Sequence, residues 1–194
     1  GEHRYVLMFL CSLSDPGLTV FPTHRLLTGL ADDTVAQQAI REALTRDFDI
    51  EQVSRDRLEP SADDVGVQLG YMDSFHKQAY MLTLKDPGIA EAALPGKPAA
   101  YQRLDTAVLE AIILKGALGM SEDDISHLRG LSYSKSFDDA REAVESGRAD
   151  AGFFMRATPV DQVREVAETG ESMPPKSTYF YPKIPTGLIF NLLE

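Results

Sequence analysis

The sequence predicts a mixed α/β (α+β) domain in which helices flank a mixed sheet of parallel and antiparallel strands. Apolar residues occupy alternate positions over residues 67–71 and 80–84, which is the pattern of half-buried strands. Residues 104–112 instead carry apolar residues at helical spacing. Residues 131–170 contain in order a strand, a helix, a strand and a helix, which predicts a β-α-β-α unit with parallel strands in the C-terminal third.

The N-terminal part is predicted to contain two strands and a helix. Residues Tyr5–Leu10 are continuously apolar, as in a central strand covered on both faces, and Cys11 beside them is expected to be a buried, inert thiol. An Asp-Pro-Gly turn at 15–17 leads into a returning strand over 19–27, which a proline interrupts. A helix is predicted over 33–48, because its apolar residues share one face.

The middle of the chain offers a boundary. Residues 87–98 contain three prolines and two glycines, which is typical of a connection. We expect one domain over residues 1–194, forming the C-terminal part of a larger protein, with subdomains 1–90 and 99–194. The helix that follows this connection is expected to end at Gly119.

The C-terminal third carries clear helix-boundary signals. Ser136 is predicted to cap one helix, and Thr158, followed by a proline, to cap another that ends at Gly170. A short apolar strand is predicted between these helices, over residues 149–155. Two further short strands are predicted between residues 179 and 190, which are rich in aromatic and β-branched residues.

Composition excludes several classes of protein. The net charge of −11 argues against nucleic acid as the main partner, because binding phosphates along a strand needs a cationic surface. Cys11 is the only cysteine, which fits a reducing, cytoplasmic location and rules out an internal disulfide. The longest apolar run is far shorter than the ~20 residues of a membrane helix.

Standard catalytic and cofactor motifs are absent. The four histidines have none of the spacings of zinc sites, so we predict no metal site. The sequence contains neither of the glycine-rich loops that bind nucleotide phosphates, and it identifies no cofactor.

Two segments nevertheless carry chemistry. In the first, Thr23, His24 and Arg25 place a hydroxyl, an imidazole and a guanidinium side by side at a strand break, and such a cluster can hold an anion. The alternative, which the sequence alone favours, is a surface strand with local hydrogen bonds.

The second segment, residues 173–183, concentrates lysines, hydroxyls and tyrosines in an acidic chain. In an extended strand, alternate side chains share a face. One face then carries Lys176, Thr178 and Phe180, and the other carries Ser177, Tyr179, Tyr181 and Lys183. The second face suits an anionic or planar ligand, but an amphipathic edge strand explains the pattern equally well.

The same segments resemble the bacterial and archaeal family called domain of unknown function 1015. Residues 13–18 and 22–26 are similar to the middle of that family, and residues 159–163 and 170–183 are similar to its C-terminal signature. The resemblance implies a missing N-terminal domain related to ParB, whose relatives in some cases handle nucleotides or phosphorylate free serine. Glu110 replaces a histidine of the family pattern, which weakens a catalytic role for that position.

Three hypotheses for function remain open. The first is a domain that binds a small phosphorylated, carboxylate or nucleotide-like ligand in a cleft shared with its own N-terminal ParB-like domain. The residues proposed for it are Thr23, His24, Arg25, Lys176, Ser177, Thr178, Tyr179, Tyr181 and Lys183. The second is a two-domain phosphotransferase that uses Mg²⁺, with His24 as the proton acceptor. The third is a structural domain whose aromatic strand forms a homo-oligomer interface.

Overall fold

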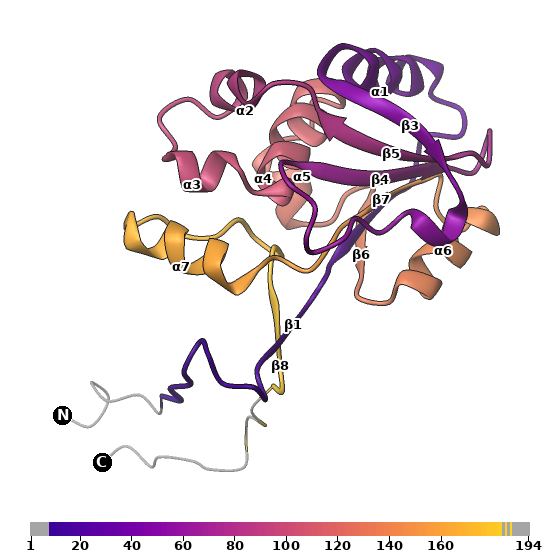
Figure 1. The fold of residues 1–194 in the computed structure, drawn as a ribbon. Helices are drawn as coiled ribbons and strands as arrows, with labels where there is room; N and C mark the ends of the chain where they lie inside the picture. The colour runs from indigo at the N-terminus through magenta and orange to yellow at the C-terminus, as the bar shows by residue number, and fades with distance from the viewer. Residues whose placement is uncertain (1–7, 184, 186, 188–194) are drawn as a thin grey trace, which may run out of the picture.

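The computed structural model describes residues 8–183, Pro185 and Gly187, which form a sheet with helices on both faces and a separate β-ribbon (Figure 1). The strands are β1 Thr19–Phe21, β2 His24–Leu27, β3 Phe48–Val53, β4 Gln68–Asp73, β5 Ala79–Leu84, β6 Leu131–Ser134, β7 Ala151–Phe154 and β8 Tyr179–Tyr181. The helices are α1 Thr34–Asp47, the 3₁₀ turn η2 Arg55–Arg57, α2 Pro87–Ala93, α3 Ala99–Gln102, α4 Asp105–Leu109, the π-helix η3 Glu110–Ala117, α5 Glu122–Ser126, α6 Phe137–Glu145 and α7 Val160–Glu168. The predicted α+β class is confirmed.

The six strands of the main sheet lie in the order β3-β5-β4-β7-β2-β6, and every neighbouring pair is antiparallel. The predicted mixture of parallel and antiparallel neighbours is therefore wrong. β6 and β7 do run in the same direction, as the β-α-β-α pattern predicts, but β2 is inserted between them and pairs with both. A strand from the other half of the chain thus replaces the expected parallel contact.

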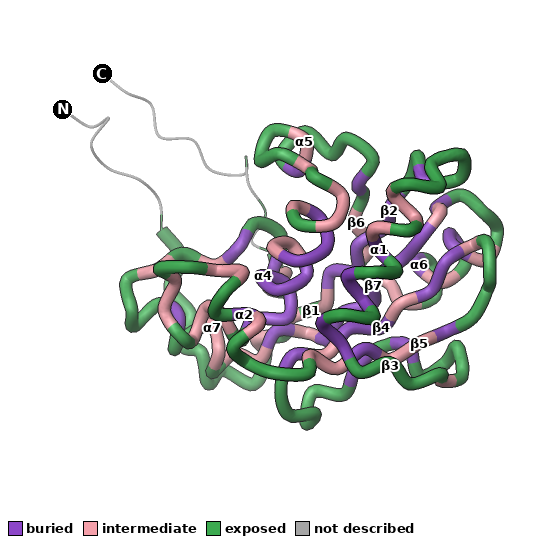
Figure 2. The backbone as a smooth tube through the Cα atoms, turned by 90° about the horizontal axis from the view of Figure 1, so that it is seen from above, coloured by how far each residue is buried: buried purple, intermediate pink, exposed green. Residues whose placement is uncertain are grey.

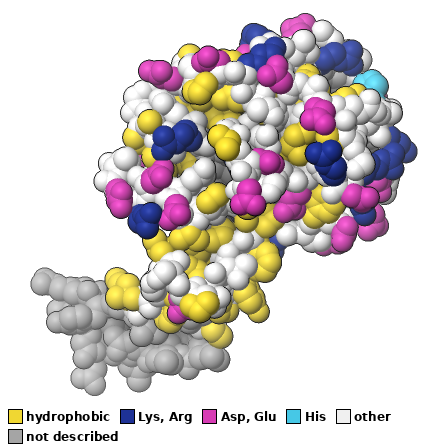
Figure 3. Space-filling model, in the orientation of Figure 1, with side chains coloured by type: hydrophobic (Ala, Val, Ile, Leu, Met, Phe, Trp, Pro, Cys, Tyr) yellow, Lys and Arg dark blue, Asp and Glu magenta, His cyan; other side chains and the backbone are white. Residues whose placement is uncertain are grey.

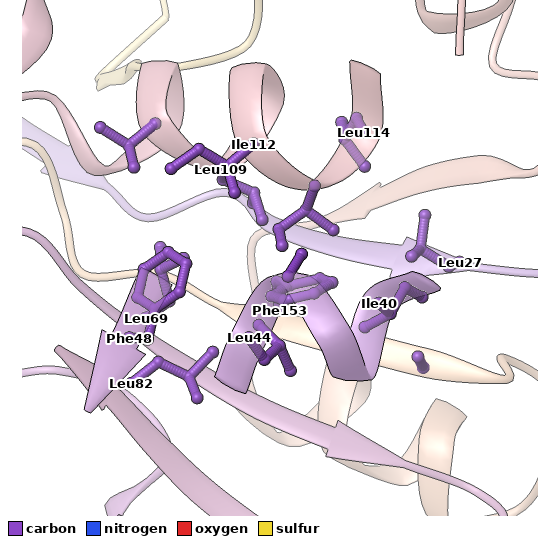
Figure 4. Packing of buried hydrophobic residues seen from close by; sticks show 14 of the residues in the cluster. Leu27, Ile40, Leu44, Phe48, Leu69, Leu82, Leu109, Ile112, Leu114 and Phe153 are labelled. Carbon is purple, nitrogen blue, oxygen red and sulfur yellow. The ribbon is translucent and has the colours of Figure 1, made fainter. Parts of the chain in front are cut away.

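The hydrophobic core has a layer on each face of this sheet. Helices α1 and η3 cover one face, where Ile40, Leu44 and Leu82 pack together (Figure 4). Helix α6 covers the other face, where Val144 packs near Phe154. Figure 2 shows that buried residues concentrate along β2, β7 and α4, while the peripheral loops are exposed.

Local signals explain most element boundaries. The Asp33 side chain accepts a hydrogen bond from the Ala36 N–H at 2.9 Å and begins α1. Ser136 caps α6 in the same way. The connection predicted at 87–98 contains the short helix α2, because the Asp86 side chain caps its first turn.

Other predictions are wrong. The predicted strand over Tyr5–Leu10 is wrong for its described part, because Met8, Phe9 and Leu10 lie outside the sheet. Their side chains are 68%, 65% and 83% exposed. Residues 5–7 lie outside the described residues. Cys11 beside this run is exposed rather than buried. An apolar run predicts burial only when another element covers it, and within the described chain none does. The second strand predicted towards residue 190 falls mostly on residues that are not described.

The predicted interruption of the strand over 19–27 is confirmed, because β1 ends at Phe21 and β2 begins at His24 in a different sheet. β1 pairs with β8 in a two-stranded ribbon that leaves the body of the molecule (Figure 1). Within the described residues no helix is long and apolar enough to cross a membrane. The division into subdomains at residues 90–99 stays a prediction.

Candidate functional site

The two chemistry-bearing segments come together at the ribbon, although Arg25 and Lys176 are 151 residues apart in sequence. In the β1–β8 register Phe21 lies opposite Tyr179 and Thr19 lies opposite Tyr181. β2 follows directly after β1, so Thr23 to Arg25 lie at the foot of the ribbon. Figure 3 shows hydrophobic side chains gathered over the ribbon where it leaves the body of the protein.

Tyr179 and Tyr181 lie two residues apart on β8 and share a face, as strand alternation requires. The Phe21 ring contacts both, with its centroid 6.4 Å from that of Tyr179 and 5.7 Å from that of Tyr181. Tyr181 is 52% exposed, so part of its ring is open to a ligand.

Two lysines converge on the Tyr179 ring. The Lys183 Nζ lies 4.6 Å from the ring centroid, and the Lys135 Nζ lies 4.0 Å from it. No carboxylate of the described residues lies within ion-pair distance of Lys135, Lys176 or Lys183, and all three lysines are exposed. Lys135 was not predicted, because it follows β6, far from either motif, and no local pattern distinguishes it.

Arg25 is a buried tether rather than a free anion ligand. Its guanidinium donates to the Thr23 carbonyl and, over 3.2 Å, to the Lys176 carbonyl, and it lies 5.3 Å from the Tyr133 ring centroid. Burial lowers the pKa of Arg25 to about 10, although the nearby Tyr133 and Glu110 partly oppose this effect by favouring the charged form. Arg25 therefore fixes the loop before β8 against β2.

His24 lies on the opposite face of β2 from Arg25, since neighbouring strand residues alternate. Its Nδ1 accepts a hydrogen bond from the Met155 N–H at 3.1 Å, so the neutral ring carries its proton on Nε2. The distance from Nε2 to Glu59 Oε2 is 3.7 Å. Burial, with a smaller effect from Arg25, lowers the pKa of His24 to about 4. Thr23, His24 and Arg25 thus form no single cluster. The alternative of a surface strand is also wrong, because every residue of β2 is buried.

The hydroxyls before β8 differ in their bonding. Thr158 does not cap α7 as predicted; its hydroxyl donates instead to the Ser177 carbonyl over 2.9 Å. The Ser177 side chain is buried, and its Oγ has no hydrogen-bond partner among the described residues. Thr178 is half-buried. Ser177 Oγ is therefore a buried hydroxyl of this described segment that lacks a partner, and its burial keeps it away from the exposed face of the ribbon.

A family model described as "Protein of unknown function (DUF1015)" matches residues 1–107, which is more than half of the chain. The chain belongs to the DUF1015 family. The matched range includes β1 and β2 and ends before α7 and β8. No curated protein matches the DUF1015 chain in sequence.

Several solved structures share the fold of this DUF1015 chain. A conserved hypothetical protein from Pyrococcus furiosus superimposes with a TM-score of 0.54 at 16% identity, over 90% of this chain and 61% of the other. A free serine kinase in complex with AMP superimposes with a TM-score of 0.50 at 14% identity, over 88% of this chain and 56% of the other. The chain therefore spans about three fifths of the length of these structures, and at such identities the likeness shows the fold alone.

The ribbon of this DUF1015 chain combines two chemical features. Lys135 and Lys183 supply positive charge beside one ring, and Tyr181 supplies an exposed aromatic face. Together they can bind a negative group and an adjoining planar group. Within the described residues no group of three or more His, Cys, Asp or Glu side chains is arranged to hold a metal ion.

Proposed function

We propose that the chain binds a small anionic ligand with a planar group, such as a nucleotide, on the ribbon face that carries Tyr179 and Tyr181. The observation that carries this proposal is the pair of lysines around Tyr179, at 4.0 and 4.6 Å, without a carboxylate among the described residues. In a chain with 30 acidic and 19 basic residues, this pair of lysines makes a local positive charge on an acidic molecule, which favours an anionic ligand at this place.

The planar part of the ligand would stack on Tyr181. This ring is about half exposed, and Phe21 supports its other side in an edge-to-face contact with an interplanar angle of 71°. Because Tyr179 and Tyr181 share a face, about 7 Å apart along the strand, one ligand can reach both the lysines and the open ring.

A second domain would complete the site. The chain spans 61% and 56% of the two structural relatives, which leaves room in a whole protein for the N-terminal ParB-like domain that the family resemblance implies. One of those relatives is described with AMP, whose phosphate and base match the chemistry of the ribbon.

The single cysteine also supports a cytoplasmic location.

A two-domain phosphotransferase is the second candidate, supported by the fold shared with a free serine kinase. The lysines would then stabilise the transferred phosphoryl group, and Mg²⁺ would need carboxylates from elsewhere. In this chain His24 is fully buried and bonded to the backbone, which favours a structural role for it. Turnover of ADP or ATP with free serine, measured on the whole protein, distinguishes a catalyst from a binding domain.

The third candidate function is a homo-oligomer interface. The exposed apolar side chains of the ribbon, such as Phe21 at 38% exposure, support it. A strict monomer in light scattering would count against it.

Isothermal titration with AMP, adenosine and inorganic phosphate tests the main proposal. AMP should bind more tightly than either part, and Lys135→Ala or Lys183→Ala should each weaken it about tenfold, the worth of one charge-assisted contact. Lys97→Ala is the matched control, since Lys97 also lies over a tyrosine ring, at 4.8 Å from Tyr101, but is paired with Glu171. Equal AMP affinity in all three variants would refute the site.

A further inference from the structure

A separate pocket of about 310 Å³ lies between α1 and the sheet strands β3, β4 and β5. Its inner walls are apolar and aromatic. They include Leu30, Ile40, Leu44, Tyr71, Tyr80 and Leu82. Figure 4 shows Ile40, Leu44 and Leu82 on this side of the sheet. The volume is near the lower limit of roughly 300 Å³ for small-molecule sites, so it suits a ligand with about one ring.

One wall of the pocket is a line of polar residues on α1. Gln37, Arg41 and Thr45 are spaced four residues apart and therefore lie along one side of the helix. Gln37 Nε2 donates to the Leu30 carbonyl over 2.7 Å, and Thr45 Oγ1 donates to the Arg41 carbonyl over 2.8 Å. The Arg41 guanidinium, by contrast, is exposed and has neither a hydrogen bond nor an ion pair within the described part of the chain.

The facing carboxylate, Asp73, is already engaged by donors of its own segment. Asp73 accepts hydrogen bonds from the N–H groups of Phe75 and His76 at 3.1 and 2.6 Å, from the Tyr71 hydroxyl at 3.2 Å, and from His76 Nδ1 at 3.1 Å. Burial, and next the charge of Asp73, raise the pKa of Tyr71, so the phenol stays protonated. Arg41 is therefore the charged group lining this pocket whose donors are all unused among the described residues, whereas Asp73 is already held by its own chain.

The pocket mouth exposes apolar surface. Ile50 on β3 and Phe75 in the β4–β5 turn line it with exposures of 44% and 39%, which is high for large hydrophobic side chains. A ligand that covers them gains hydrophobic stabilisation in addition to its contact with Arg41.

We propose that this pocket binds a small monocarboxylic acid with an apolar body. The body lies among Ile40, Leu44 and Leu82, and the carboxylate pairs with the Arg41 guanidinium at the mouth. This site is independent of the ribbon, because it is built from α1 and the β3–β5 edge of the sheet, so either proposal can fail without the other.

The test uses phenylacetate as the probe, with benzylamine and benzyl alcohol as its cationic and neutral counterparts. Amide NMR shifts locate the bound probe, and titration of those shifts measures its Kd. Phenylacetate should bind with shifts in α1 and the β4–β5 turn, and Arg41→Ala should weaken it about tenfold. Arg57→Ala, which removes another exposed arginine without an ion pair among the described residues, should leave the Kd unchanged.

Several results would overturn the proposal. These are an absence of phenylacetate binding at millimolar concentration, equal affinity in Arg41→Ala and the parent, tighter binding of benzylamine, or shifts confined to β8. The last result would assign the carboxylate to the ribbon lysines instead. Arg41 is exposed, so its replacement by alanine leaves the folding of α1 unaffected, and far-ultraviolet circular dichroism verifies this.

Discussion

Replacing Asp105 with alanine should strongly destabilise the protein, because it leaves a buried arginine without its counter-ion. The Arg156 Nε donates to Asp105 Oδ2 over 2.7 Å, and its Nη2 donates to Oδ1 over 3.1 Å. Both side chains are almost completely buried, at 4% and 10% exposure. The guanidinium also donates to the carbonyls of Ser61, Asp64 and Gly66, which fastens the loop before β4.

The expected loss in the free energy of unfolding is about 3–5 kcal/mol, the usual cost of breaking a buried pair by removing one partner. The loop carbonyls still satisfy N–H donors of Arg156, but they do not neutralise its charge. The Gln68 N–H also loses its acceptor, Asp105 Oδ1 at 3.1 Å. This loss is a large share of the ~5–15 kcal/mol that stabilises an ordinary domain.

Urea denaturation followed by circular dichroism measures the effect. Glu165→Ala is the matched control, since its carboxylate accepts from Arg103 at a similar 2.8 Å, but the side chains are 59% and 45% exposed. That change should cost less than about 1 kcal/mol. The Asp105→Ala, Arg156→Ala double variant should lose clearly less than the sum of the single losses. A cost for Asp105→Ala no larger than that of the control would show that the pair is solvated, and the reasoning would be wrong.

Two further predictions concern β2 and β4. Burial lowers the pKa of His24 to about 4, so as the pH falls below 6.5 the unfolded chain takes up a proton that the folded chain does not. The free energy of unfolding should therefore fall by roughly 3 kcal/mol between pH 6.5 and pH 4, and His24 should not change it above pH 6.5. Urea unfolding midpoints should depend on pH across this range in the parent and not in His24→Gln. An equal pH dependence in both proteins would contradict a neutral, buried His24. Gly70→Ala should cost about 3 kcal/mol or more, because its Cβ would lie 1.7 Å from the Leu58 carbonyl oxygen and 3.0 Å from Phe154 Cβ. An unchanged Tm in thermal unfolding would show that β4 and Leu58 are further apart.

The segments predicted well from sequence are those controlled by near neighbours. Asp33 and Ser136 cap helices through hydrogen bonds to residues three positions on, and β4 and β5 follow a two-residue alternation. No strand is predicted at β3, because the helix prediction extends to Phe48 and the residues after it are mostly polar; their exposure suits an edge strand.

The α+β class, the boundaries of elements such as α1 and α6, and the concentration of lysine and tyrosine before the C-terminus follow from the sequence alone, since each depends on residues within a few positions of one another. Which side chains meet depends on the tertiary structure. It inserted β2 between β6 and β7, buried Arg25 and His24 on opposite faces, and brought Lys135 to Tyr179. These contacts join residues separated by tens to more than a hundred positions, and their energy comes from packing and strand pairing that no local pattern records.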